Sequence, residues 1–216
     1  MRIIGLCGGS GSGKGEVCRA FERLGIPTLD TDAVYHSIIS APCDCVNEIK
    51  NVFGPHVVSE TTGGLDRMRL REEVFPEIKT DRSDFLLSRL NEISHKYVLK
   101  TAREWLLAQK GSGAPAAVID APLLFESGFD KECDLILLVT APLNLRVERI
   151  KSRDGISESE AKRRISAQLD DEKLREVSDA VIENHGDLSN LYAQVCSFVE
   201  KYIKGNFPGK RDVKLK

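Results

Sequence analysis

A glycine-dense segment near the start of the chain has the residue types and spacing of a phosphate-binding loop. Residues 8–15 have the sequence GGSGSGKG, with Lys14 directly after Gly13. They fit the pattern G-x-x-x-x-G-K-[ST] except at the last position, where Gly15 replaces serine or threonine. Glycines let the backbone approach an anion closely, and the N–H groups that begin the next helix attract negative charge. We therefore predict a phosphate site, with Lys14 as a point charge for β- and γ-phosphates.

Three other side chains could take part in phosphoryl transfer. Asp32 follows the apolar run 25–30, where a carboxylate can accept a proton from an attacking hydroxyl. The alternative is that Asp30 or Asp32 only caps the helix that begins there. His36 shares a helix face with Asp32, although a single histidine in such a place is more often a packing residue. Asp120 ends another apolar run, where an acid can either reach a Mg²⁺ shell or cap the next turn.

Arginines cluster on two predicted helices that are joined by a turn at residues 154–157. Arg149 and Arg153 are four residues apart and therefore share a helix face. Taken alone, such arginines are commonly solvated surface residues. Beside a phosphate-binding loop they favour a lid that closes on a triphosphate and excludes water. The other members are Arg146, Arg163 and Arg164.

The elements that must position these residues follow an α/β pattern. Apolar runs predict buried strands at residues 1–7, 25–30, 116–120, 134–140 and 179–183. Helices are predicted over residues 14–24, 32–40 with Thr31 as cap, 142–153, 157–168 with a capping box at Ser157, and 188–203. The opening strand–loop–helix–strand order indicates right-handed parallel crossovers. We predict a P-loop NTPase-like, three-layer α/β/α fold with a central parallel sheet of about five strands.

The strand pattern stops between residues 41 and 110, which indicates a helical insertion. Its predicted helices cover 45–53, 67–75 and 83–109, the last with a break near Ser94 and His95 as an alternative, and 54–65 is a loop with a small hairpin. We therefore predict four parts: a nucleotide-binding core (1–40, 111–140, 173–204), a helical substrate lobe (41–110), a lid (141–172) and a flexible basic tail (205–216).

The composition of the chain narrows the possible classes of partner and of metal site. The 216 residues carry 31 Lys and Arg against 33 Asp and Glu, so no overall field favours nucleic acid, and local positive charge must meet any anionic substrate. The six cysteines are scattered, and Cys43 and Cys45 lack partners at zinc spacing, which favours reduced thiols over a metal site. No leading signal or membrane-length apolar run occurs. We expect a cytoplasmic protein with neither nucleic-acid nor membrane partners; the oligomeric state is not determined by these patterns.

The ordered motifs resemble those of the dephospho-CoA kinases, which phosphorylate the ribose 3′-hydroxyl of dephospho-CoA in the last step of coenzyme A synthesis. The resemblance runs from Ile3 to about Val195. Many families share the P-loop, but its combination with the later motifs is specific. These motifs are DTD (30–32), GLDR (64–67), LNEISH (90–95), PLLFE (122–126), RDGIS (153–157), RISAQ (164–168) and DAVIEN (179–184).

The resemblance implies ATP and dephospho-CoA as substrates and Mg²⁺ as a cofactor. Asp32 takes the place of the family's catalytic aspartate, while Lys14, Arg149 and Arg153 would neutralise the transferring charge. The loop residues that would hold ATP phosphates are Gly9, Ser10, Gly11, Ser12, Gly13, Lys14, Gly15 and Glu16. The residues expected to bind the acceptor substrate are Asp32, His36, Arg67, His95, Leu123 and Leu124. Asp120 would serve the metal, through water if not directly.

Three positions depart from the family pattern. Gly15 and Glu16 replace the usual Ser-Thr pair, which removes a hydroxyl ligand of Mg²⁺; His95 lacks the usual following proline; and Arg146 stands where glutamine is common. Two alternatives therefore stay open: a nucleoside monophosphate-type kinase, or a nucleotide-binding protein with weakened catalysis. Because a P-loop grips phosphate mainly through backbone N–H groups, we expect nucleotide binding to survive the change at Gly15.

Overall fold

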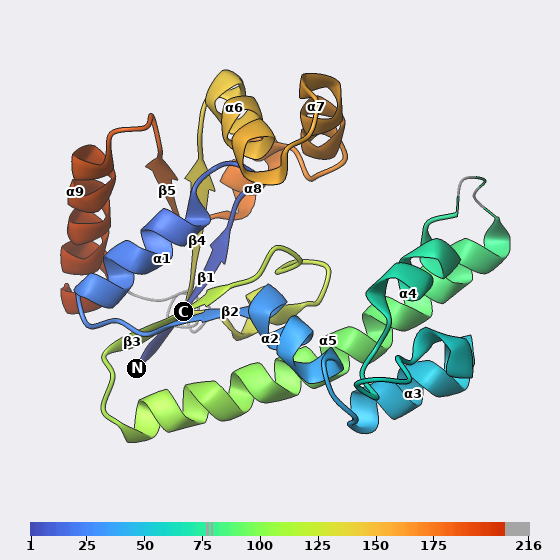
Figure 1. Ribbon diagram of the computed structural model, residues 1–216. Coiled ribbons are helices and arrows are strands. Elements are labelled where there is room, and N and C mark those ends of the chain that lie inside the picture. Colours follow the sequence, from blue (N-terminus) through green and yellow to red (C-terminus); the bar gives the residue numbers. More distant parts are fainter. Residues whose placement is uncertain (77, 79, 206–216) are drawn as a thin grey trace. The chain divides into compact units, whose positions relative to one another are not determined.

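Five parallel strands form one sheet in the order β2-β3-β1-β4-β5 (Figure 1). The computed structural model describes residues 1–76, 78 and 80–205. The strands are β1 (Arg2–Cys7), β2 (Thr28–Asp30), β3 (Ala116–Asp120), β4 (Leu135–Thr140) and β5 (Ala180–Glu183). Every residue of β4 is buried, as expected when a parallel sheet is covered on both faces. The predicted α/β fold with about five parallel strands is confirmed.

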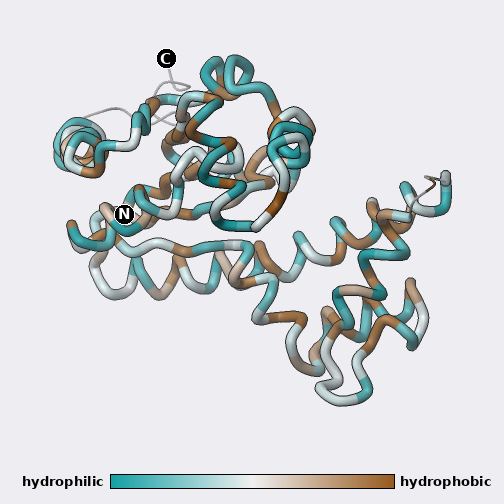
Figure 2. Tube along the Cα trace, turned by 45° about the horizontal axis from the view of Figure 1, so that its top comes forward, coloured by the Kyte–Doolittle hydropathy of each residue, from teal (hydrophilic) through white to brown (hydrophobic). Residues whose placement is uncertain are grey.

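Contacts divide the chain into two units, residues 31–105 and the remainder. The helices of the unit that contains the sheet are α1 (Lys14–Arg23), α6 (Leu143–Asp154), α7 (Glu158–Ser166), α8 (Asp171–Val177) and α9 (Leu188–Phe198), which continues as a π-helical turn over Val199–Lys204. On one sheet face α1 packs against α9, where Phe21 and Phe198 meet edge to face with ring centroids 5.8 Å apart. Figure 2 shows hydrophobic residues inside this unit and hydrophilic ones over its helices.

β5 is an edge strand, and on its outer side a side chain makes the hydrogen bonds that a further strand would make to its last residue, Glu183. The Gln194 side chain of α9 accepts from the Glu183 N–H at 3.0 Å and donates to the Glu183 carbonyl at 2.9 Å. Both backbone groups at this end of the strand are therefore satisfied within the chain.

The second unit, residues 31–105, is helical. It contains α2 (Thr31–Ile39), α3 (Asp44–Phe53), a 3-10 turn at Pro55–Val57, α4 (Arg67–Val74) and most of α5 (Asp81–Gly111). Asp66 caps α4 by accepting from the Met68 and Arg69 N–H groups. Val58 bridges Leu65, which confirms a small hairpin in the predicted loop. The buried apolar side chains of this helical unit include Ile39, Val46, Ile49, Phe53, Leu70, Leu86 and Ile93.

Several local predictions need correction. α5 runs unbroken past Ser94 and His95, because its buried apolar stripe continues on both sides of them. Thr31 is the first residue of α2 and not its cap. α8 was not predicted; the Asp170 side chain caps it by accepting from the Glu172 N–H. Ser157 does form the predicted capping box.

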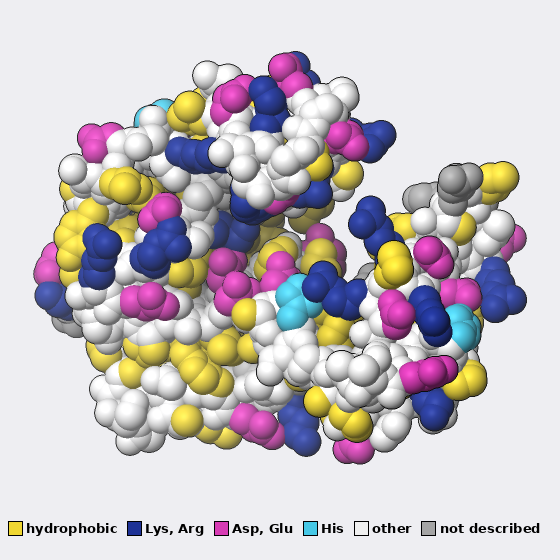
Figure 3. Space-filling model, viewed as in Figure 1, with side chains coloured by type: hydrophobic (Ala, Val, Ile, Leu, Met, Phe, Trp, Pro, Cys, Tyr) yellow, Lys and Arg dark blue, Asp and Glu magenta, His cyan; other side chains and the backbone are white. Residues whose placement is uncertain are grey.

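Two further predictions concern the chain as a whole. Apart from residue 205, the predicted basic tail lies outside the described residues. Among the described helices, none has the length and apolar content that a bilayer crossing needs. Lys and Arg are interspersed with Asp and Glu on the face drawn in Figure 3. The division into core, substrate lobe and lid stays a prediction.

Candidate active site

The loop between β1 and α1 takes a shape that favours glycine at Gly8, with a φ of 142°, and at two further positions. Gly11 and Gly13 have φ values of 77° and 99°, in the left-handed region. A Cβ on Gly11 would also lie 2.6 Å from the Arg146 carbonyl oxygen, and one on Gly13 would collide with the Asn184 side chain. Glycine is therefore required in this segment both by the backbone conformation and by the close packing of Arg146 and Asn184 against it. α1 begins at Lys14, so its first N–H groups face the loop.

Lys14 and Asp120 lie together at the carboxyl ends of the central strands. The Lys14 ammonium donates to the Gly8 carbonyl at 3.0 Å, and its Nζ is 4.0 Å from Asp120 Oδ1. Their side chains are only 15% and 13% exposed, so the pair is largely screened from bulk water. Asp120 is the register partner of Asp30 on β2. Ligands of open parallel sheets bind at this edge, which makes the Lys14–Asp120 pair the electrostatic centre of the candidate site.

A thiol also faces this centre. The Cys18 Sγ lies 3.9 Å from Asp120 Oδ2 and donates to it. Burial raises the pKa of Cys18 to about 12, and the negative charge of Asp120 acts in the same direction. Cys18 is therefore a neutral donor to Asp120 and not a nucleophile at physiological pH.

The donor set fits Mg²⁺ that is held mainly by phosphate and water. No group of three or more His, Cys, Asp or Glu side chains suited to a metal occurs among the described residues. Mg²⁺ at phosphate sites commonly uses only one or two carboxylates, together with phosphate oxygens and water. Asp120 could supply that carboxylate. Gly15 supplies no side chain, and a Cβ added there would have no atom within 4 Å.

The predicted lid arginines differ in their surroundings. Arg149 donates through Nη1 to the carbonyls of Gly11 (3.0 Å) and Ser12 (3.3 Å), and through Nη2 to Asn184 Oδ1 (3.1 Å). Arg153 instead pairs with Asp154, and its side chain is 63% exposed. Asp154 also forms an ion pair with Arg164, and these two arginines lower the pKa of Asp154 to about 2. The structure thus brings Arg149, but not Arg153, into contact with the P-loop.

Three residues, Gln168, Asp171 and Asn184, contact the loop or its partners without having been predicted as site residues, and Arg146 of the predicted arginine cluster joins them. Arg146 is 5% exposed; it donates from Nε to the Ser10 carbonyl at 2.9 Å and pairs with Asp171 at 3.1 Å. The Gln168 side chain accepts from the Ser10 N–H at 2.7 Å. Asn184, 3% exposed, donates to the Ser12 carbonyl at 2.8 Å. The sequence signal for Gln168 and Asn184 was membership of the RISAQ and DAVIEN motifs, and that for Arg146 was the arginine cluster; Asp171 only lies near the RISAQ motif.

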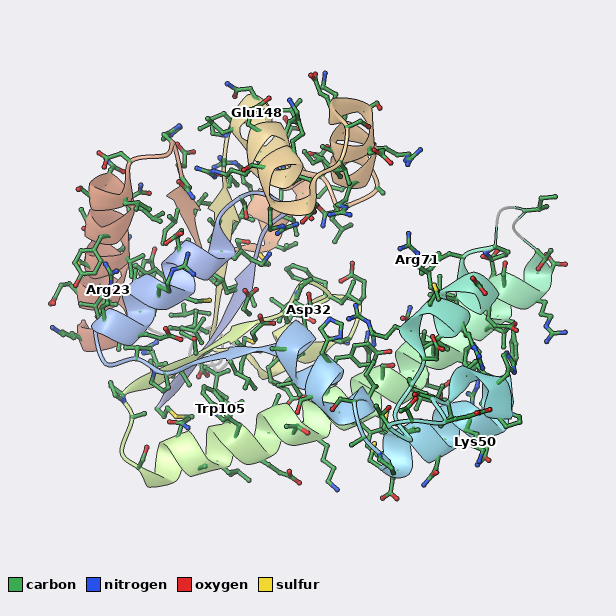
Figure 4. All side chains as sticks on the ribbon, in the orientation of Figure 1. Arg23, Asp32, Lys50, Arg71, Trp105 and Glu148 are labelled. Atoms are coloured by element: carbon green, nitrogen blue, oxygen red, sulfur yellow. The ribbon has the colours of Figure 1, made fainter. Side chains whose placement is uncertain are left out.

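The predicted acceptor-substrate residues fall in both units. Asp32 lies in the first turn of α2, directly after β2 in the chain (Figure 4). His36 and Arg67 line one groove of about 490 Å³ in the helical unit. His95 lies in α5 and does not line that groove.

Leu123 and Leu124 are neighbours in sequence but differ in access. Leu123 is 45% exposed, whereas Leu124 is fully buried. The Leu124 side chain packs against Gly5 of β1, where a Cβ would lie 2.9 Å from its Cδ2 atom. Leu123 is therefore accessible from solvent, while Leu124 supports the turn from the core side.

Comparisons with known proteins identify the family of the chain. The family model described as dephospho-CoA kinase matches residues 2–190. A dephospho-CoA kinase of Corynebacterium diphtheriae is 35% identical over 187 residues, covering 86% of this chain and 90% of the relative, and one of Arabidopsis thaliana is 34% identical over 194 residues, covering 90% and 81%. The crystal structure of TT1252 from Thermus thermophilus superimposes with a TM-score of 0.77 at 32% identity, covering 93% of this chain and 97% of that one. A dephospho-CoA kinase from Campylobacter jejuni has the same fold, with a TM-score of 0.70 at 22% identity and coverage of 96% and 100%. The chain belongs to the dephospho-CoA kinase family.

Proposed function

We propose that this chain transfers the γ-phosphoryl group of ATP to the ribose 3′-hydroxyl of dephospho-CoA. In this step the O3′–P bond forms, the bond from Pγ to the ADP oxygen breaks, and Asp32 accepts the hydroxyl proton. The observation that carries the proposal is the Lys14–Asp120 pair at the carboxyl edge of the sheet. Asp32 is two residues beyond Asp30, the register partner of Asp120, so covalent geometry limits the Asp30–Asp32 Cα distance to about 7 Å.

The residues of the sheet-containing unit have distinct roles in this proposal. Backbone N–H groups of residues 9–16 and the Lys14 ammonium bind the ATP phosphates. Asp120, directly or through water, would hold Mg²⁺, which would supply neutralisation of the phosphate charge. Arg149 positions the loop through the Gly11 and Ser12 carbonyls. Arg153 would add charge from the lid if its pair with Asp154 opens.

The groove in the helical unit suits part of the acceptor substrate. Its walls combine apolar side chains with Arg67 and Arg71, the second of which is labelled in Figure 4. Dephospho-CoA carries a flexible chain with apolar segments and a pyrophosphate, so such a lining offers contact area and charge together. Tyr35 and His36 add aromatic edges at the same groove. We assign Leu123, but not the buried Leu124, to substrate contact.

The decisive experiment measures ADP release with ATP, Mg²⁺ and dephospho-CoA. In Asp32→Asn, kcat should fall about 100-fold or more because the proton acceptor is lost, while the Kd for ATP stays unchanged. Asp44→Asn, at the start of α3, is the matched control and should keep kcat. Undiminished turnover of Asp32→Asn would refute the role of Asp32. Preferred turnover of AMP, CMP or UMP, or ATP binding without any turnover, would instead favour one of the two alternative functions.

A further inference from the structure

The Gln168 side chain accepts a hydrogen bond from a backbone N–H group of the P-loop. Its Oε1 accepts from the Ser10 N–H at 2.7 Å, between residues 158 positions apart in sequence. The same oxygen would lie 3.2 Å from a Cβ placed on Gly9. The end of the Gln168 side chain therefore rests on the loop at residues 9 and 10, within the stretch proposed to bind phosphate.

An ion pair between the buried Arg146 and the partly exposed Asp171 holds the segment that carries Gln168. Asp171 at the start of α8 accepts from Arg146 Nη1 at 3.1 and 3.2 Å, and Arg146 donates from Nε to the Ser10 carbonyl at 2.9 Å. Only 7% of the Arg146 side chain is exposed. Gln168 and Arg146 thus hold the N–H and the C=O of the same residue, and the charge-assisted pair makes this brace stiffer than two neutral bonds would.

We propose that Gln168 is a latch, an affinity-determining side chain that ATP must displace from the Ser10 N–H. This inference rests on the proposed function, in which ATP phosphates bind the loop. An amide oxygen and a phosphate oxygen are both acceptors, and a single N–H cannot serve both at full strength. The charged phosphate is the stronger acceptor and replaces the amide oxygen. The apparent affinity for ATP is nevertheless lowered, because only the fraction of molecules in which Gln168 has left the Ser10 N–H can bind ATP fully.

Displacement has a second consequence for the chain. Gln168 lies between α7, which ends at Ser166, and α8, which begins at Asp171. Once its side chain leaves Ser10, the connection between these helices loses one of its bonds to the loop. ATP arrival at the P-loop is thereby coupled to release of the lid segment, with Arg146 and Asp171 keeping the segment attached.

The test compares ATP affinity in three variants of the full chain by calorimetric titration. Gln168→Asn keeps the amide but is one methylene shorter, so it loses the Ser10 bond and should lower the Kd about three- to tenfold. Gln168→Glu should raise the Kd at least about tenfold, because a carboxylate holds the N–H more strongly and repels triphosphate. Ser166→Ala, in the same lid, should leave the Kd unchanged. Deuterium exchange of residues 8–13 should quicken in Gln168→Asn only.

An unchanged or raised Kd in Gln168→Asn would overturn the latch, since the side chain would then be inert or would itself bind ATP. The Gln168→Glu variant supplies the opposite sign: a Kd equal to that of the wild type would also overturn the proposal. Absence of ATP binding by the wild-type chain would instead overturn the nucleotide site of the proposed function. The two failures are therefore distinguishable.

Discussion

Arg149 and Asn184 are joined by a 3.1 Å hydrogen bond, and both side chains also donate to the carbonyl of Ser12. One residue lies on α6 and the other follows β5, so two elements distant in sequence hold the same P-loop peptide group. Asn184 is 3% exposed, and its own N–H donates to the Thr140 carbonyl at 2.8 Å. The carbonyl of Ser12 is thus held by protein donors from two elements, which fixes the path of the backbone around the proposed phosphate site.

Removal of the Asn184 side chain should weaken both the fold and ATP binding. Asn184→Ala leaves the buried Ser12 carbonyl with fewer donors, so we expect the free energy of unfolding to fall by about 1–3 kcal/mol. The Kd for ATP should rise in parallel, while the KM for dephospho-CoA changes little. Urea unfolding and ATP titration provide the measurements. Asn47→Ala, on the exposed side of α3, is the control; an equal loss of stability there would contradict this role of Asn184.

Restoring a hydroxyl at position 15 should strengthen the response to Mg²⁺. Gly15 is helical, and a Cβ there meets no atom within 4 Å, so Gly15→Ser fits without strain. The hydroxyl can join the metal shell, so the Mg²⁺ concentration that gives half-maximal activity should fall severalfold. Gly15→Ala gives a similar gain in helix propensity without the oxygen and separates the two effects. Identical Mg²⁺ titrations for all three proteins would show that Asp120 and water already complete the shell.

The ion pairs of Asp154 make part of the stability depend on pH. Arg153 and Arg164 lower the pKa of Asp154 from 3.8 to about 2, so the folded state favours the carboxylate. The resulting stabilisation is present above about pH 4 and is lost as the pH falls toward 2. Melting temperatures of wild type and Asp154→Asn should therefore differ at pH 7 and converge in acid. A difference that stays constant from pH 7 to pH 3 would exclude this cause.

Two thiols beside the P-loop should resist alkylation. Burial raises the pKa of Cys7 to about 11 and that of Cys18 to about 12, so few thiolates exist at pH 8. Iodoacetamide treatment of the folded protein, followed by mass spectrometry, should leave both unmodified. In urea all six cysteines should react, which serves as the control. Rapid labelling of Cys18 in the folded protein would contradict its contact with Asp120.

The parts of the fold that were predicted from the sequence depend on local spacing. The strands are short apolar runs, and the capping box from Ser157 to Glu160 spans only four residues. The P-loop is likewise one continuous stretch. α8 was missed because its seven residues bury only Leu174, which leaves no periodic apolar face to detect.

The site was less predictable because its bonds join distant segments. Gln168 and Asn184 reach Ser10 and Ser12 from 158 and 172 residues away, and no short spacing encodes such contacts. Arg146 is of a residue type that is usually exposed, yet it is buried because Asp171 and a loop carbonyl satisfy its guanidinium. Lys14 and Asp120 were predicted because Asp120 ends β3 and Lys14 follows the loop after β1, so both lie at the carboxyl ends of neighbouring strands.

The pairing of Gln194 with Glu183 bears on how the protein behaves at high concentration. β5 borders the sheet, and an open border strand is a template on which another chain can add a strand. Because one side-chain amide fills both outward hydrogen-bonding positions of Glu183, the border is closed at the carboxyl end of β5. An incoming strand would therefore have to displace the Gln194 amide before it could pair with Glu183, which shortens the edge that edge-to-edge association could use.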